Sequence, residues 1–380
     1  MNKDIFAKFI NQNYVEQELV NIGFDSTYRH HACLKNTYKT IKIFNLRPQE
    51  ASILKQSALA LGFDAAVHRG VLDCSVDISD ALLTGSIVQF EKLALSLKKQ
   101  PFKMKQVAEN ILSLITNELS PLKIKNKIFD WKRPYIMGIV NVTPNSFSDG
   151  GNFFDVDNAI NHIQKLIGDG ADIIDIGAES THPNNKQITT DEEIKRLKPI
   201  LSELKNFNLS IPISIDTRNV KTAEFAIENG ADIINDVGFS DFNEEMITFV
   251  NQNNIPYIYT HNRAHEDNLI DNVFNDFLIA NDKITTSVIF DVGIGFGKSI
   301  NQNYELLKRI NEFKSFNIPL LVGHSRKSFL SKTFELSTIE DLDEATVLTS
   351  AQLVKEGVNI LRVHNVKSHK FLIDLYSKFC

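Results

Sequence analysis

The residues best able to do chemistry in this 380-residue sequence follow short runs of apolar residues rich in Val and Ile. They stand at the ends of eight such runs: Asn141 with Asp149, Thr181 with His182, Asp216 with Arg218, Asn235 with Asp236, His261 with Asn262, Asp291 with Lys298, Ser325 with Lys327, and Arg362 with His364. One Asp or Asn in such a place is commonly a helix cap or a turn former. Eight ends that all carry polar groups indicate a shared site.

The apolar runs alternate with longer amphipathic stretches from Pro134 onward, which is typical of βα units. The predicted strands are Tyr135–Val142, Asp172–Gly177, Ile211–Ile215, Asp232–Val237, Pro256–Thr260, Val288–Val292, Pro319–Val322 and Asn359–Val363. The predicted helices are Val156–Ile167, Asp191–Leu204, Val220–Glu228, Glu244–Asn251, Asn272–Thr285, Tyr304–Phe313, Leu342–Lys355 and Lys367–Phe379. Eight βα units in about 250 residues predict a (β/α)₈ TIM barrel.

An open doubly wound sheet is the alternative fold. Against it, the chain has no GxGxxG fingerprint after its first predicted strand. Three similar sequence segments begin at Gly170, Gly230 and Gly357. Each indicates a helix that ends at a glycine and is followed by a buried strand. This repeat favours the barrel.

Residues 1–130 are expected to form a smaller N-terminal domain, whose role the sequence leaves open, and residues 131–380 are expected to form the barrel domain. The N-terminal part mixes helical pattern at Ala51–Leu61, Val88–Leu97 and Gln106–Thr116 with a strand expected at Ala65–Leu72. It is therefore expected to be mixed α/β. A fragment beginning near Asn126 is expected to close the barrel without it.

In a TIM barrel the reacting groups lie at the carboxyl ends of the strands, which is where the polar residues fall. Arg362 and His364 alternate on the last predicted strand and so point to one face, where two cations would suit an anion such as phosphate. The segment Val292–Ser299 is close to a P-loop, but valine replaces its first glycine. Nucleotide hydrolysis is therefore rejected.

Composition narrows the class of protein. The hydrophobic share of 43% and the charged share of 23% are those of a globular protein. No apolar run reaches the ~18 residues of a membrane span, and Asp4 comes too early for a signal peptide. Cys33, Cys74 and Cys380 have no metal-ligand spacing, and the lysines are mostly scattered. We expect a cytoplasmic protein without membrane or nucleic-acid partners.

The motifs together resemble the dihydropteroate synthase family. They are Gly138–Pro144 with Ser146–Gly151, Ile176–Thr181, Ser214–Thr217, Ile234–Asp236, Gly295–Lys298, Gly323–Ser328 and Arg362–His364. They run in family order over roughly residues 134–380. The resemblance implies that 6-hydroxymethyl-7,8-dihydropterin diphosphate and 4-aminobenzoate become 7,8-dihydropteroate and diphosphate, with Mg²⁺ on the leaving group.

The resemblance also assigns roles. Asp216, Asn235, Asp291 and Lys327 match pterin-binding positions, and Asn141, Arg362 and His364 match the diphosphate end, with Asn141 as the metal ligand. Thr181, Phe296 and Ser328 match positions that contact 4-aminobenzoate. Asp216, Lys327 and Asp149 are expected to be catalytic. Whether the chain is a homodimer is left open.

Two positions depart from the family pattern: Asn145 stands where Asp is usual, and His182 stands where Arg is usual. A hydrogen bond between them is expected to replace an ion pair that would help to close the loops. Two alternatives follow from the same motifs, namely a pterin-binding methyltransferase that uses a corrinoid and a non-catalytic pterin-binding relative.

Overall fold

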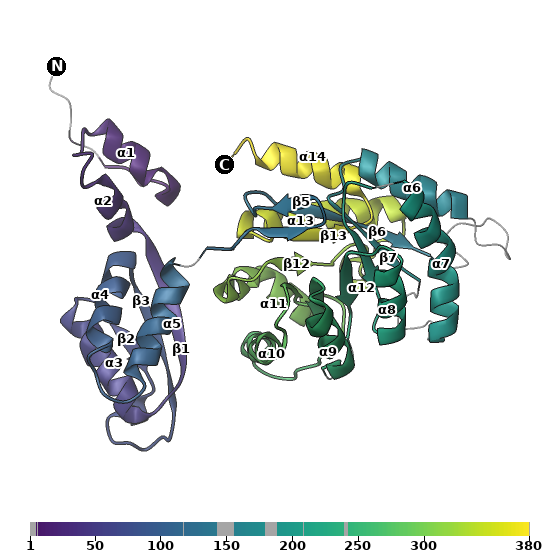
Figure 1. The fold of residues 1–380 in the computed structure, drawn as a ribbon. Coiled ribbons are helices and arrows are strands. Elements are labelled where there is room, and N and C mark those ends of the chain that lie inside the picture. Colours follow the sequence, from purple (N-terminus) through teal and green to yellow (C-terminus); the bar gives the residue numbers. More distant parts are fainter. Residues whose placement is uncertain are drawn as a thin grey trace. The chain divides into compact units, whose positions relative to one another are not determined.

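The computed structural model describes residues 5, 7–116, 118–142, 156–178, 188–207, 209–238 and 242–379. The chain forms two compact units, residues 1–118 and 119–380; Figure 1 colours them purple to blue and blue to yellow, respectively. Within the described ranges, no helix is long and apolar enough to cross a membrane. Asp149, Thr181, Asn145 and His182 lie outside these ranges, so the predictions about them stay predictions.

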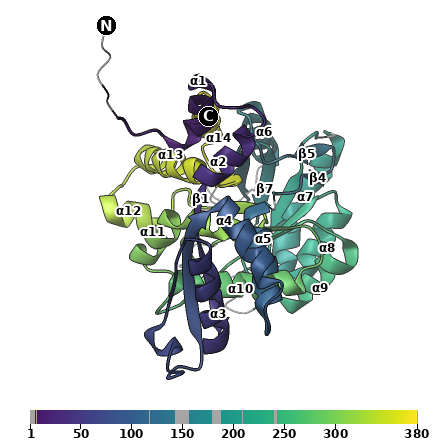
Figure 2. The ribbon, with the colours of Figure 1, turned by 90° about the vertical axis from the view of Figure 1, so that its left-hand side faces the viewer.

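The first unit is built on an antiparallel three-stranded sheet in the order β1–β3–β2. Its elements are α1 (Val15–Asn21), α2 (Arg29–Asn36), β1 (Tyr38–Leu46), α3 (Pro48–Ala60), β2 (Ala65–Val67), β3 (Ser79–Ser86), α4 (Ile87–Leu97) and α5 (Met104–Thr116). Alternate residues of β3 are buried, so one face of the sheet joins the core. Helices α4 and α5 pack side by side, as both views show (Figures 1 and 2). The expected smaller α/β region is confirmed.

The strand expected at Ala65–Leu72 was too long. The strand β2 ends at Val67, and a 3₁₀-helix occupies Arg69–Val71. The ring nitrogen Nδ1 of His68 accepts a hydrogen bond of 3.1 Å from the backbone N–H of Gly70, which turns the chain out of the sheet.

The second unit is a closed barrel of eight parallel strands, which confirms the predicted fold (Figure 1). The order around the barrel is β10–β11–β12–β13–β6–β7–β8–β9. The strands are β6 (Tyr135–Asn141), β7 (Ile173–Gly177), β8 (Ile213–Asp216), β9 (Ile233–Asp236), β10 (Tyr257–Thr260), β11 (Val288–Asp291), β12 (Leu320–Val322) and β13 (Ile360–Val363). Their outward side chains pack against the helices that surround the barrel.

The helices of the barrel are α6 (Val156–Gly168), α7 (Thr190–Asn206), α8 (Val220–Glu228), α9 (Glu244–Asn253), α10 (Leu269–Lys283), α11 (Ile300–Lys308), α12 (Ser328–Phe334), α13 (Ile339–Glu356) and α14 (Val366–Tyr376). The short helix α12 was not expected from the sequence. At the end of α13, Gly357 adopts φ 84°, which is the left-handed conformation that the repeated segment predicted.

The amino-terminal end of the barrel is closed by a two-stranded hairpin, β4 (Leu122–Ile124) and β5 (Lys127–Phe129). Ile124 and Phe129 are buried against the innermost apolar layer of the barrel, which comprises Met137, Ile173, Ile233, Ile258, Ile289, Leu321 and Ile360. The hairpin therefore belongs to the second unit, and the predicted boundary after residue 130 falls too late. A chain that begins near Asn126 would cut the hairpin at its turn.

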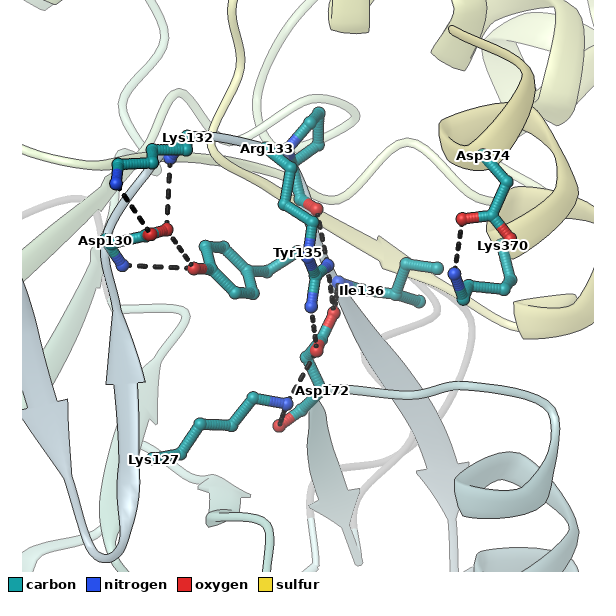
Figure 3. A network of polar contacts seen from close by, with 10 residues as sticks. Lys127, Asp130, Lys132, Arg133, Tyr135, Ile136, Asp172, Lys370 and Asp374 are labelled. Carbon is teal, nitrogen blue, oxygen red and sulfur yellow. Dashed lines mark hydrogen bonds and ion pairs between the residues drawn. The ribbon is translucent and has the colours of Figure 1, made fainter. Parts of the chain in front are cut away.

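The hairpin is fastened to the barrel through Asp172, a buried carboxylate just before β7 (Figure 3). Lys127 Nζ donates to its Oδ1 at 2.6 Å, and Arg133 donates to both of its oxygens at 2.8 and 3.0 Å. The backbone N–H of Ile136 donates to Oδ2 at 3.0 Å. Burial alone would raise the pKa of Asp172, but the bonds from Arg133 and Lys127 hold it below its ordinary value.

A fragment of residues 119–380 should fold by itself and bind pterin, because it retains the barrel and its closing hairpin. A fragment of residues 131–380 should be markedly less stable, since it lacks Ile124, Phe129 and Lys127. Circular dichroism melts and pterin titration of the two fragments would check this. Equal stability of both would show that the hairpin contributes little, and an insoluble longer fragment would show that the two units fold together.

Candidate active site

A polar layer lies directly above the apolar layer inside the barrel. Alternate residues of a strand point to the same face, so the positions two residues beyond the apolar layer also face the interior. On four strands these positions hold Asp175, Asn235, Asp291 and Arg362. Asp216 is the register partner of Asn235 on the neighbouring strand and joins the same layer. The barrel therefore brings together residues that are far apart in sequence.

Arg362, from β13, is the centre of this layer. Its Nε donates to Asp175 Oδ2 at 2.6 Å, and its Nη2 donates to Asp216 Oδ2 at 2.6 Å. Burial alone would lower the pKa of Arg362, but Asp175 and Asp216 raise it above its ordinary value. The guanidinium stays charged and holds two carboxylates from neighbouring strands.

Three carboxylates and three cations meet in this layer and beside it. Asp175, Asp216 and Asp291 face Arg362 and Lys327, and Lys298 also acts on Asp291. Burial is the main reason that the pKa of Asp216 is raised to about 7; Arg362 lowers it and Asp175 raises it further. Burial also raises the pKa of Asp291, whose Oδ1 accepts from the backbone N–H of Gly293 at 2.9 Å. Carboxylates accept hydrogen bonds and donate none, so this cluster suits a ligand that brings N–H donors.

Lys327 reaches this layer from the position just before α12, which it caps. Its ammonium lies 4.0 Å from the centre of the Phe296 ring, a cation–π contact. Burial lowers the pKa of Lys327 to about 8; Arg362 lowers it further, while Asp291 and Asp216 oppose the change. The structure thus pairs two residues from different predicted subsites, because Phe296 lies against the pterin-side lysine.

His364 does not supply the positive charge that its place beside Arg362 suggested. Burial and the nearby Arg326 and Arg362 lower the pKa of His364 to about 3, so its ring is neutral near pH 7. Its Nδ1 lies 2.9 Å from the hydroxyl oxygen of Ser325. His364 is therefore a hydrogen-bonding group, and Arg362 is the cation of this pair.

The other predicted residues lie around the mouth. Asn141 ends β6 and is half-buried, and Ser328 begins α12 and is exposed. Within the described ranges, neither side chain hydrogen-bonds to the polar layer.

Asp175 belongs to this polar layer, and the sequence reasoning missed it. It lies within a run of Ile residues and was counted as part of a buried strand. The two-residue period of a strand could have identified it. Asp175 lies two residues from Ile173 and two from Gly177, so all three point to the same face of the strand. A charged residue at an inward position of a barrel strand indicates a site.

A second cluster, His261, His265 and Asp276, has ligand atoms within 4.8 Å of one another, as a metal site would. Both histidine Nε2 atoms lie 3.0 Å from Asp276 Oδ2, and Arg263 Nη1 donates to Oδ1 at 3.0 Å. The ammonium of Lys298, which donates to the His261 carbonyl, lies close by. A divalent cation would join two positive charges here, so the cluster is a hydrogen-bonded anchor for the loop after β10.

Comparison with known proteins agrees with this geometry. The pterin binding enzyme family matches residues 137–364, which include most of β6, all of β7 to β13 and the whole polar layer. The chain is therefore a pterin-binding enzyme built on a (β/α)₈ barrel.

Its relatives narrow the class further. A dihydropteroate synthase of Clostridium beijerinckii is 39% identical over 254 residues, which are 64% of this chain and 94% of that protein. The crystal structure of a dihydropteroate synthase from Clostridium difficile, in the presence of pteroic acid, superimposes with a TM-score of 0.62 at 35% identity; the match covers 65% of this chain and 97% of that one. The chain belongs to the dihydropteroate synthases, which are transferases of folate biosynthesis.

One relative also matches the region before the barrel. A probable bifunctional folylpolyglutamate synthase/dihydropteroate synthase of Haloferax volcanii is 33% identical over 356 residues, which are 86% of this chain and 42% of that protein. This share exceeds what the barrel unit alone provides, so the match extends into the first unit. The first unit is therefore not peculiar to this chain.

Proposed function

We propose that the mouth of this barrel joins the pterin of 6-hydroxymethyl-7,8-dihydropterin diphosphate to 4-aminobenzoate, releasing diphosphate and 7,8-dihydropteroate. The observation that carries the proposal is the polar layer, in which three carboxylates and an amide lie together with Arg362 inside the barrel, while Lys327 lies beside them. A pterin ring presents several N–H donors along one edge, and carboxylates are acceptors only. The ring supplies the donors that this pocket needs.

The pterin would lie on Asp216, Asn235, Asp291 and Lys327. Asp216 and Asp291 accept from ring N–H groups, Asn235 pairs with an edge of the ring, and the Lys327 ammonium donates to a ring acceptor. Because these groups come from three strands and the start of α12, the rigid barrel holds them in place before the ligand binds.

The diphosphate would lie outward of the ring, near Asn141 and His364 and on the outer side of Arg362. Asp175 and Asp216 occupy two donors of the Arg362 guanidinium on the inner side, so the leaving group takes the outer side. Asn141 offers one neutral oxygen, which fits Mg²⁺ that keeps most of its ligands as water and substrate phosphate oxygens. Bound Mg²⁺ would neutralise charge on the departing diphosphate.

4-Aminobenzoate would bind against Phe296, with its carboxylate toward Ser328 and Thr181. The Phe296 ring gives an apolar wall for the benzene ring, and it already contacts the ammonium of Lys327. This contact brings the arylamine next to the pterin, where the new bond must form.

In the reaction, the C–O bond between the pterin methylene and the diphosphate breaks, and the electron pair leaves with diphosphate. The amine nitrogen of 4-aminobenzoate then forms a C–N bond to the methylene carbon and loses a proton to solvent. Asp216 and Asp291 stabilise the positive charge that develops on the pterin ring as diphosphate departs. Asp149, which follows β6 in the sequence, is also proposed as a catalytic residue.

Purified protein should form dihydropteroate from the two substrates with Mg²⁺, and omission of 4-aminobenzoate should abolish the product. Chromatographic detection of dihydropteroate and of diphosphate would check this. Pterin binding without product would show instead a non-catalytic pterin-binding protein. The methyltransferase alternative is set aside, because the relatives that share this barrel are dihydropteroate synthases. A cytoplasmic location stays a prediction, and the oligomeric state stays open.

A further inference from the structure

Asp175 is fully buried in the middle of β7, and it has none of the roles proposed for the other residues of the polar layer. One of its oxygens has two donors: Oδ2 accepts from Arg362 Nε at 2.6 Å and from Asn235 Nδ2 at 3.0 Å. Asp175 is therefore the residue that links the central cation of the polar layer to its amide.

This link determines which side of the Asn235 amide faces a ligand. A carboxylate accepts hydrogen bonds and donates none, so Asn235 must turn its NH₂ group toward Asp175. The carbonyl oxygen of the amide then lies on the opposite side, where it can accept from a ligand N–H group. Without Asp175 the amide is free to rotate and to present a donor.

The same link fixes Arg362. Its Nε is held by Asp175 and its Nη2 by Asp216, so two carboxylates from neighbouring strands set the plane of the guanidinium. Removal of Asp175 would leave only one of these contacts.

Among the described residues, the other oxygen of Asp175 is buried and has no hydrogen-bond partner. The same holds for the hydroxyl of Ser214, which is the register partner of Asp175 on β8. Side chains in register on neighbouring parallel strands point to the same face, so both side chains point into the barrel. Asp172, at the other end of the barrel, differs because donors satisfy both of its oxygens.

We propose that Asp175 is a positioning residue for the pterin substrate, which sets the amide of Asn235 and the guanidinium of Arg362 in their binding orientations. The inference rests on the proposed function, since it takes the pterin as the ligand of Asn235. Unsatisfied hydrogen-bonding capacity beside the site supports this role over a purely structural one, because a buried structural carboxylate is normally fully paired.

The experiment compares Asp175→Asn and Asp175→Glu with the unchanged full-length protein. The KM of each substrate, kcat and the pH profile are measured, and the Kd for pterin alone is determined by titration. Asp175→Asn should raise the pterin Kd and the KM for the pterin diphosphate at least ~10-fold, while the KM for 4-aminobenzoate changes less than ~2-fold. Asp175→Glu keeps the charge but displaces both partners, so it should raise the same two constants.

The pH profile distinguishes the effect of the charge of Asp175 from the effect of its position. The groups that act on Asp216 are Arg362 of β13, Asp175 of β7, Lys327 before α12 and Glu193 of α7, and the charge of Asp175 raises its pKa. Asp175→Asn should therefore move the acidic limb of kcat/KM to lower pH, whereas Asp175→Glu should leave it in place.

A merely structural role would give less folded protein, with unchanged KM values and an unchanged acidic limb, and that result would overturn the inference. Should Asp175→Asn fail to fold, an unchanged pterin Kd in Asp175→Glu would overturn it equally. Failure of the proposed function is recognised separately, because the unchanged protein would then bind pterin but form no dihydropteroate. The pterin titrations would still test Asp175.

Discussion

Lys327→Ala and Asp216→Asn should each reduce turnover by at least ~100-fold while the barrel stays folded. Both side chains lie in the buried polar cluster where, under the proposed mechanism, positive charge develops on the pterin, so their electrostatic effect should be large there. Steady-state kinetics and circular dichroism of the two variants would measure activity and folding. Lys332→Ala, at an exposed position of α12, is a control that should retain full activity. Near-normal turnover in both variants would remove these residues from the site.

The pH dependence of the unchanged protein should report the same two residues. Asp216 must be ionised to accept from the pterin, and its pKa is raised to about 7, so kcat/KM should fall as the pH drops through about 7. Lys327 must be protonated to donate, and its pKa is lowered to about 8, so kcat/KM should also fall above about 8. Asp216→Asn should abolish the acidic limb of its residual activity.

Asp172→Ala should lower the free energy of unfolding of the barrel by about 3–5 kcal/mol. The change leaves Lys127 without its carboxylate, removes both contacts of Arg133 and strips the buried N–H of Ile136 of its acceptor. Trp131 is the single tryptophan and stacks on Phe129 at the hairpin, so its fluorescence reports unfolding of this end. Denaturant titration followed at Trp131 would give the change.

Figure 3 also shows the control for this experiment, the exposed pair of Lys370 and Asp374 on α14. Asp374→Ala should cost less than about 1 kcal/mol, because water replaces the lost partner. Since the folded-state pKa of Asp172 is depressed, its stabilising contribution should be present above pH ~4 and lost as the pH falls through the folded pKa. A loss no larger than that of Asp374→Ala would show that the network does not fasten the hairpin.

The alternation of apolar runs and amphipathic stretches predicted the closed barrel correctly, because strand and helix periods are local properties of the chain. The ends of those runs predicted Asp216, Asn235, Asp291 and Arg362 as neighbours, and the structure brings all four into one layer. Local sequence was less informative where a tertiary contact decides the structure. From the sequence alone, the segment that forms the hairpin β4–β5 was interpreted as a basic connector. Its Ile124 and Phe129 instead close the amino-terminal end of the barrel.

The sequence by itself determined the fold and which residue types reach the mouth of the barrel, since period and order along the chain are sufficient for both. Only the tertiary structure decided the charge states and the pairing. His364 is neutral because burial and two arginines lower its pKa, and Asp175 joins the polar layer because Arg362 and Asn235 reach it from other strands. Both effects depend on residues that lie far apart in the chain, and distances between such residues exist only once the barrel has closed.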